Sequence, residues 1–144
     1  MIRFFLFLSS CILINAEVLT TSPSGVSLKP LSVCCNIPEI GNPEVLRQCT
    51  PSRQSGPCND VQCAFEKSGF LSEPQILNKE AYVSHLRGWA EKNPGWSSAV
   101  EKAISDCVDK DLRQHLDVPC KAYDVFACTG IAMLKRCPAA SWQC

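Results

Sequence analysis

The chain has 144 residues, of which 46% are hydrophobic, and its 14 basic residues balance its 14 acidic residues. This length predicts one domain with a hydrophobic core large enough to fold. Because neither sign of charge dominates, nucleic acids and anionic membrane surfaces are not expected as partners.

The first sixteen residues have the pattern of a secretory signal peptide. A short positive start, Met1–Arg3, precedes the apolar run Phe4–Ile14, and Ala16 is a small residue suited to cleavage. We expect removal of residues 1–16, which gives a mature formal charge of −1; the alternative is a buried N-terminal helix. No apolar stretch reaches the roughly 20 residues that a bilayer span requires. The mature chain is therefore predicted to be soluble and secreted.

Removal of that segment leaves an even number of cysteines, which predicts five disulfides in an oxidising compartment. Metal-binding thiolates usually occur in Cys-x-x-Cys pairs, and the chain has none, so neither a metal nor a cofactor is expected. Spacing alone leaves the pairing open. The cysteines predicted to be bonded are Cys34, Cys35, Cys49, Cys58, Cys63, Cys107, Cys120, Cys128, Cys137 and Cys144.

The first part of the mature chain is predicted to be an extended arm, residues 17–33, rich in Ser, Thr and Pro. The adjacent Cys34 and Cys35 are expected to bond to separate elements, because a bridge between neighbours strains the peptide. Asn42 and Pro43 have the pattern of a helix start, which predicts a helix through Cys49. A polar loop, residues 50–56, follows.

Four further helices are predicted. One begins at Pro57 and ends at Gly69, and its Cys58 and Cys63 point about 140° apart. The next runs from Asn78 to Asn93, and the third begins at Ser97 or Ser98. Their apolar stripes are Tyr82, Leu86, Trp89 and Ala90, then Val100, Ile104, Cys107 and Val108. A charged turn, 109–117, leads to the last helix, and no strand is predicted.

The last predicted helix starts with a cap at residues 117–119 and runs to about Arg136. It is apolar on both sides and has no charge from Val125 to Leu134. A helix that is apolar all round is buried all round, so we expect it at the centre of the domain. Cys128 and Cys137 point about half a turn apart, which predicts bonds to two different elements.

Amphipathic helices around a central helix can form a packed core or enclose a cavity, and periodicity does not distinguish the two. Tyr82, Tyr123 and Trp89 each carry a polar group that could orient a ligand. The candidate pocket residues are Phe65, Leu71, Ile76, Tyr82, Leu86, Trp89, Val100, Ile104, Tyr123, Phe126, Ile131, Met133 and Leu134.

The cysteine pattern resembles a known family. The run CNDVQCAFEKSGFL at residues 58–71, followed by Cys107 and by Cys128 and Cys137 with eight residues between them, resembles insect odorant-binding proteins. The extra Cys34, Cys35, Cys120 and Cys144, with Pro138 after Cys137, are similar to the Plus-C subgroup. Two spacings depart from the family: four residues separate Cys58 and Cys63, and the tail after Cys137 is short.

The resemblance covers about residues 34–144 and implies a single ligand-binding domain. The implied fold is all-α, a disulfide-locked bundle of about six or seven helices around an apolar pocket. The implied function is reversible carriage of small hydrophobic molecules, such as odorants or pheromones, in an extracellular fluid. Implied bridges are Cys58–Cys128, Cys107–Cys137, and Cys63 with Cys34, Cys35 or Cys49. A membrane chemoreceptor and a second copy of the chain are candidate partners.

Catalysis is not expected, because neither histidine, His85 or His115, lies in a metal-binding or triad-like motif. Cys34-Cys35 also lacks the following histidine of a secreted phospholipase. His115 is a candidate pH-sensitive group, since imidazole titrates at about pH 6.5, or a solvated surface residue. A role of either histidine in ligand release stays open. The alternatives to a carrier are a secreted helical interaction or signalling protein with a packed core, and saposin-like lipid binding.

Overall fold

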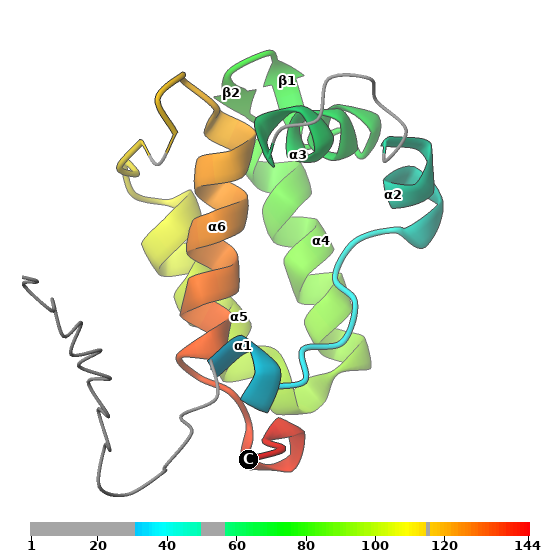
Figure 1. Ribbon diagram of the computed structural model, residues 1–144, viewed down its shortest axis with the longest axis vertical. Coiled ribbons are helices and arrows are strands. Elements are labelled where there is room, and N and C mark those ends of the chain that lie inside the picture. Colours follow the sequence, from blue (N-terminus) through cyan, green and yellow to red (C-terminus); the bar gives the residue numbers. More distant parts are fainter. Residues whose placement is uncertain (1–30, 50–56, 115) are drawn as a thin grey trace, which may run out of the picture.

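The computed structural model describes residues 31–49, 57–114 and 116–144 (Figure 1). The predicted signal peptide, residues 17–30 of the predicted arm, the predicted loop at 50–56 and His115 lie outside the described residues. The last residues of the predicted arm, 31–33, are helical rather than extended. Together with Cys34 they form a single helical turn.

The described part of the chain contains six α-helices, so the predicted all-α class is confirmed. A 3-10 turn at Pro94–Trp96 precedes α5, a π-helical turn at Ile104–Val108 continues it, and a second 3-10 turn occupies Ala139–Ser141. None of these helices is both long and apolar enough to cross a bilayer. The helices are α1 (Leu31–Cys34), α2 (Pro43–Cys49), α3 (Pro57–Lys67), α4 (Lys79–Lys92), α5 (Ser97–Ala103) and α6 (Lys121–Leu134).

Local sequence signals define several helix ends. The Asn42 carboxamide oxygen accepts a hydrogen bond from the backbone N–H of Glu44 at 3.0 Å, at the start of α2. The Asn78 oxygen likewise accepts from Ala81 at 3.2 Å, at the start of α4. Gly69, which follows α3, has a φ of +72°, a conformation that glycine adopts without strain. These predicted boundaries are confirmed.

A short antiparallel hairpin corrects the prediction of no strands. Strands β1 (Leu71–Glu73) and β2 (Ile76–Leu77) pair, with Leu71 opposite Leu77. Strands this short carry too few residues for an alternating pattern, so their sequence gives no usable signal. The turn between them presents Gln75, whose side-chain oxygen accepts from the backbone N–H of Lys121 at 2.8 Å. The hairpin therefore supplies a cap to α6.

This contact explains a second correction. The predicted cap at residues 117–119 is wrong, since α6 begins at Lys121 and its N-cap residue, Cys120, makes no side-chain capping bond. A first-turn N–H that lacks a local acceptor needs another partner. Gln75, 46 positions away in the sequence, provides it.

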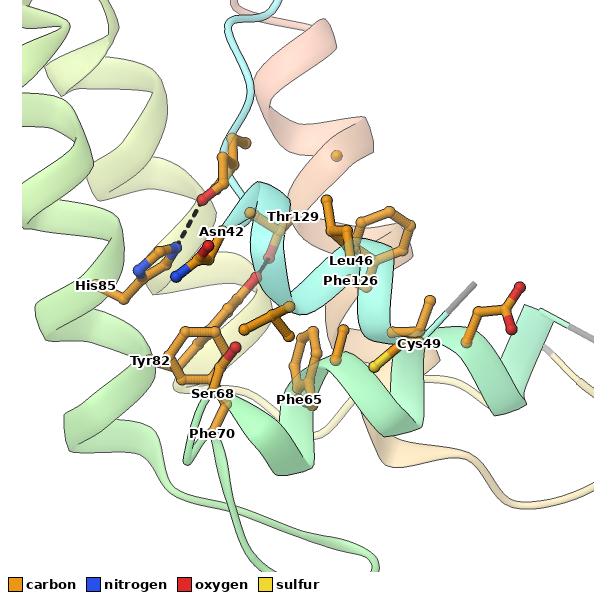
Figure 2. Close-up of a pocket in the computed structure, with 17 residues that line it drawn as sticks. Asn42, Leu46, Cys49, Phe65, Ser68, Phe70, Tyr82, His85, Phe126 and Thr129 are labelled. Carbon is orange, nitrogen blue, oxygen red and sulfur yellow. Dashed lines mark hydrogen bonds between the residues drawn. The ribbon is translucent and has the colours of Figure 1, made fainter. Parts of the chain in front are cut away.

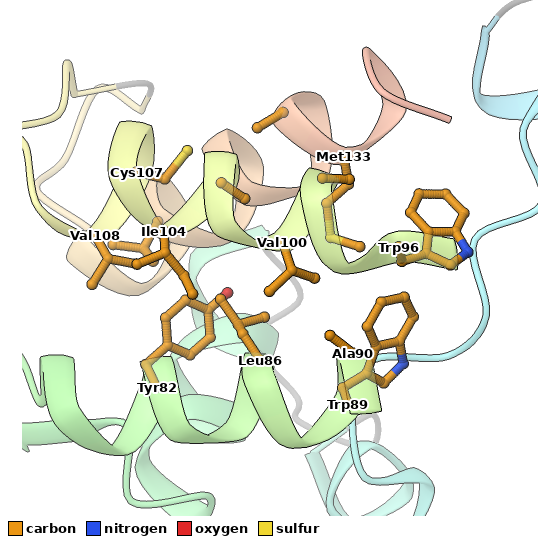
Figure 3. Close-up of a cluster of buried hydrophobic side chains, with 14 of the residues drawn as sticks. Tyr82, Leu86, Trp89, Ala90, Trp96, Val100, Ile104, Cys107, Val108 and Met133 are labelled. Carbon is orange, nitrogen blue, oxygen red and sulfur yellow. The ribbon is translucent and has the colours of Figure 1, made fainter. Parts of the chain in front are cut away.

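The core lies between α4, α5 and α6 (Figure 3). Leu86 from α4, Val100 from α5 and Met133 from α6 are almost fully buried. Burial of one such side chain stabilises the fold by about 1.5–3 kcal/mol. The residues of both predicted stripes, on α4 and on α5 with its π turn, are buried, so these helix faces are confirmed.

The prediction that α6 is buried all round is wrong. Ala122, Val125 and Met133 are buried, but the side chains of Phe126 and Ile131 are 52% and 47% exposed. Helix α6 packs against α3, α5, β2 and the π turn, and these contacts leave Phe126 and Ile131 exposed. An uncharged helix can keep apolar side chains at the surface, because hydrophobic residues are not confined to the interior.

Five disulfides connect the helices. As predicted, Cys128 and Cys137 bond to different elements, and so do Cys58 and Cys63. The resemblance left three possible partners for Cys63, and in the structure its partner is Cys49. The bridges are Cys34–Cys144, Cys35–Cys137, Cys49–Cys63, Cys58–Cys120 and Cys107–Cys128.

Two bridges implied by the resemblance, Cys58–Cys128 and Cys107–Cys137, are wrong. Cys120, directly before α6, bonds to Cys58 near the start of α3, because α3 crosses the end of the bundle where α6 begins (Figure 1). Cys128, in the middle of α6, faces the π turn and bonds to Cys107. Cys137, beyond the end of α6, is left to bond to Cys35.

The π turn also carries a local ion-pair network. The Asp106 carboxylate lies 2.8 Å from the ammonium groups of both Lys102 and Lys110. Hydrogen bonds from these lysines lower the pKa of Asp106 to about 2. These ion pairs stabilise the widened turn itself, and the Cys107–Cys128 bridge attaches it to α6.

Candidate ligand pocket

A pocket of about 200 Å³ lies between α2, α3, α4, α6 and the segment that precedes α2 (Figure 2). Its lining is mainly apolar, and it lies beside the core rather than at its centre. The lining residues are Ile40, Gly41, Asn42, Val45, Leu46, Cys49, Asp60, Val61, Ala64, Phe65, Ser68, Phe70, Tyr82, His85, Phe126, Thr129 and Gly130.

Aromatic rings form one wall of the pocket. The ring centroids of Phe65 and Phe70 are 5.5 Å apart, and each lies 5.2 Å from the centroid of Tyr82. Edge-to-face and tilted pairs of this kind each contribute about 0.5–1.5 kcal/mol beyond their buried area. The three rings therefore support one another, and apart from the Tyr82 hydroxyl the wall presents carbon atoms to the pocket.

Two buried hydroxyl groups lie among these apolar side chains. The Tyr82 hydroxyl of α4 is 3.3 Å from the Thr129 hydroxyl of α6, and the two residues are only 4% and 3% exposed. Burial raises the pKa of Tyr82 to about 12, although the hydrogen bond to Thr129 acts in the opposite direction. The phenol is therefore neutral at physiological pH and keeps its O–H.

Another wall is the segment before α2, which two ring N–H groups of α4 hold in place. The Trp89 indole donates to the carbonyl oxygen of Glu39 at 2.9 Å, and His85 Nε2 lies 2.8 Å from the carbonyl oxygen of Ile40. Since a carbonyl oxygen only accepts, Nε2 carries the proton in this contact. On the other side of the segment is an open, more polar hollow bordered by Glu91, Lys92 and Gly88, among others.

Helix α2 closes a further side of the pocket. The Cys49–Cys63 disulfide attaches it to α3, and the Lys67 ammonium donates to the Gln48 side chain at 3.2 Å. Its Leu46 is partly exposed, as is Phe126 of α6, and both line the pocket (Figure 2). These two side chains therefore lie where the pocket meets solvent.

Two helical glycines border open space. A Cβ atom added at Gly130 of α6, which lines the pocket, would have no heavy atom within 4 Å outside its own helical surroundings. The same holds for Gly88 of α4, which lines the open hollow instead. The two positions form a matched pair, because a larger side chain at either one enters empty space, but only one of these spaces is the pocket.

The structure brings three of the thirteen candidate residues to the pocket: Phe65, Tyr82 and Phe126. Ligand binding by any of them stays a prediction. Of the others, Leu86, Trp89, Val100, Ile104 and Met133 lie in the packed core; Leu71, Tyr123 and Leu134 are half-buried; and Ile76 and Ile131 are exposed.

Sequence reasoning missed most of the pocket. Val45, Leu46 and the segment from Ile40 to Asn42 were assigned no site role, and Thr129 is polar in an otherwise apolar stretch. One signal was present in the chain: Thr129 and Gly130 interrupt the large side chains of α6 on the side that the pocket occupies. In the described ranges, no group of three or more histidine, cysteine, aspartate or glutamate residues is placed to hold a metal ion.

Comparison with known proteins finds a distant similarity. The chain is 24% identical over 126 residues to general odorant-binding protein 68 of Anopheles gambiae. The matched region covers 74% of this chain and 59% of that protein, so the chain spans less than two thirds of its relative. No family model matches. The similarity and the disulfide-linked helical fold both favour an odorant-binding-like protein.

Proposed function

We propose that this protein is a secreted, non-enzymatic carrier that binds small hydrophobic molecules reversibly in the pocket between α2, α3, α4 and α6. The observation that carries the proposal is the pocket of about 200 Å³ with a mainly apolar lining. The similarity to an odorant-binding protein and the five disulfides support it. The cysteine pattern supports the Plus-C subgroup, and the apolar start supports a signal peptide.

The size of the pocket defines the class of ligand. An engineered apolar cavity of about 150 Å³ in another protein binds benzene, so this pocket suits a substituted aromatic or a monoterpenoid. A methylene group contributes only about 0.8 kcal/mol, and shape therefore selects weakly. We expect broad specificity among molecules of this size. A chemoreceptor as recipient and a homodimer stay predictions.

The two helical glycines provide the test. Binding of the apolar fluorophore N-phenyl-naphthylamine is measured for the refolded wild type, Gly130→Leu and Gly88→Leu. The wild type is expected to show saturable binding that apolar competitors displace. Gly130→Leu fills the pocket and should weaken binding by at least about tenfold. Gly88→Leu, which extends into the open hollow, should bind like the wild type.

Two outcomes contradict the proposal. Absence of saturable, displaceable binding to the wild type would favour the alternative, an interaction or signalling protein without an internal ligand. Equal binding by the wild type and both leucine variants would show that the fluorophore binds elsewhere on the surface. Circular dichroism checks that each variant keeps its helices, and the substitution of a helical glycine is expected to favour the helix.

A further inference from the structure

The pocket contains one buried polar feature, the hydroxyl pair of Tyr82 and Thr129 (Figure 2). The other polar lining groups differ from it. The Asn42 oxygen caps α2, and His85 Nε2 is bonded to the Ile40 carbonyl. Asn42 and Asp60 are exposed, and Ser68 is only half-buried. The hydroxyl pair is therefore the polar group that a ligand meets when it is surrounded by the apolar walls.

One O–H donor of this pair lacks an acceptor among the described residues. Each hydroxyl has one O–H donor and two lone pairs, so the pair has two donors. The bond between them uses one donor, whichever way the two hydroxyls are rotated. No other described side chain or backbone group accepts the second O–H. Buried donors in proteins nearly always have a partner, and one without a partner is costly.

We propose that the pocket selects ligands carrying a neutral oxygen acceptor, such as a ketone, ester or alcohol, which accepts a hydrogen bond from the unused O–H of the Tyr82–Thr129 pair. This inference rests on the proposed carrier function and deepens it. The pair lies within an apolar lining, so the ligand oxygen replaces a missing partner rather than a competing protein group.

The surroundings of the pair disfavour an anionic ligand. The described lining includes the carboxylate of Asp60 and contains neither lysine nor arginine. Transfer of a carboxylate from water into such a pocket is very unfavourable without a cationic partner. A neutral oxygen loses far less solvation and gains the hydrogen bond. The ligand class is therefore a moderately polar volatile-sized molecule rather than a hydrocarbon or a fatty acid anion.

Matched ligands and variants test the inference. Butylbenzene and butyrophenone differ only in the replacement of a CH2 group by a carbonyl, and both are measured by displacement of N-phenyl-naphthylamine. Either single variant, Tyr82→Phe or Thr129→Val, leaves one O–H in the pocket, so the decisive variant combines the two. It replaces both partners by apolar groups of similar shape, a change that is nearly neutral for stability.

In the double variant, the affinity for butyrophenone relative to that for butylbenzene is expected to fall by about fivefold, the contribution of one neutral hydrogen bond. Tyr123→Phe is the control, because Tyr123 does not line the pocket. If the double substitution changes the affinities for the two ligands equally, or changes neither affinity, the inference is overturned. Failure of both ligands to displace the fluorophore from the wild type would instead overturn the carrier function.

A second measurement avoids any dependence on a folded variant. The carbonyl stretching band of isotope-labelled butyrophenone is recorded by infrared difference spectroscopy when the ketone is bound to the wild type. A hydrogen bond from the pair should shift the band to lower frequency relative to the ketone in cyclohexane. A bound band at the cyclohexane position would overturn the inference.

Discussion

Tyr82 combines the two properties of the pocket in one side chain. Its ring packs against Phe65 and Phe70, and its hydroxyl contacts Thr129 across the interface between α4 and α6. Burial raises the pKa of this phenol from 10.0 to about 12. The same environment that provides an apolar wall therefore keeps the hydroxyl protonated.

The raised pKa predicts a loss of stability at alkaline pH. Because the native state holds the Tyr82 proton more tightly than the unfolded state, stability is unaffected below pH 10 and falls as the pH rises from 10 to about 12. Two pKa units correspond to about 3 kcal/mol of unfolding free energy. Urea denaturation across this range should show the loss in the wild type and in Tyr123→Phe. A loss of the same size in Tyr82→Phe would contradict the assignment.

Helix α2 is an element that tertiary contacts hold in place. Its seven residues are too few for a stable isolated helix, and it packs mainly against α3. The Cys49–Cys63 bridge and the hydrogen bonds from His85 and Trp89 to the preceding segment position it over the pocket. The pocket therefore depends on covalent and polar attachments as well as on core packing.

Removal of the Cys49–Cys63 bridge should affect both stability and binding. The bridge spans 14 positions, and the chain-entropy model assigns about 3 kcal/mol to a loop of this size. We expect the Cys49→Ala/Cys63→Ala variant to lose about this much unfolding free energy and to bind N-phenyl-naphthylamine more weakly, because Val45 and Leu46 are no longer held in position.

The Cys34–Cys144 bridge provides the control. It spans 110 positions, lies away from the pocket, and should cost more stability when it is replaced by alanines. Its removal should leave the affinity for the fluorophore unchanged in the folded protein. If both double variants bind equally weakly, the effect on binding reflects general destabilisation and the role assigned to α2 is wrong.

At the scale of the whole molecule, the disulfides join parts of the chain that are distant in sequence. Two bridges connect α1 and the residue after it to the C-terminal segment, where the backbone N–H of Gln143 also donates to the Cys34 carbonyl at 2.7 Å. Cys58–Cys120 joins the starts of α3 and α6, and Cys107–Cys128 joins the π turn to α6. Different disulfides therefore cross-link the end of the bundle where α6 begins and the end where the chain terminates (Figure 1).

Peptide mapping tests this framework. Cleavage with trypsin under non-reducing conditions should give peptide 103–110 linked to peptide 122–135, which reports Cys107–Cys128. Peptide 54–67 contains both Cys58 and Cys63 and should appear in one species with peptides 48–53 and 114–121, as the bridges Cys49–Cys63 and Cys58–Cys120 together require. Mass spectrometry identifies both. A link between peptides 54–67 and 122–135 would place Cys128 on Cys58 or Cys63 and contradict the Cys107–Cys128 bridge.

Features that depend on neighbours along the chain were predictable. Asn42 and Asn78 cap their helices, and the stripe from Tyr82 to Ala90 faces the core, because capping and helical periodicity act within a few residues. Cys128 and Cys137 bond to different elements as predicted, although Cys137 lies beyond the end of α6, where the helical angle used for that prediction no longer applies.

The sequence by itself determined the helical class, the main helix boundaries and which cysteines must diverge. Only the tertiary structure decided the partner of each cysteine, the exposure of Phe126, the cap that Gln75 supplies to α6, and the position of the pocket beside the core. A pocket is the volume that several packed elements leave unfilled. Its position depends on their relative placement, and helical periodicity within one segment carries no information about that placement.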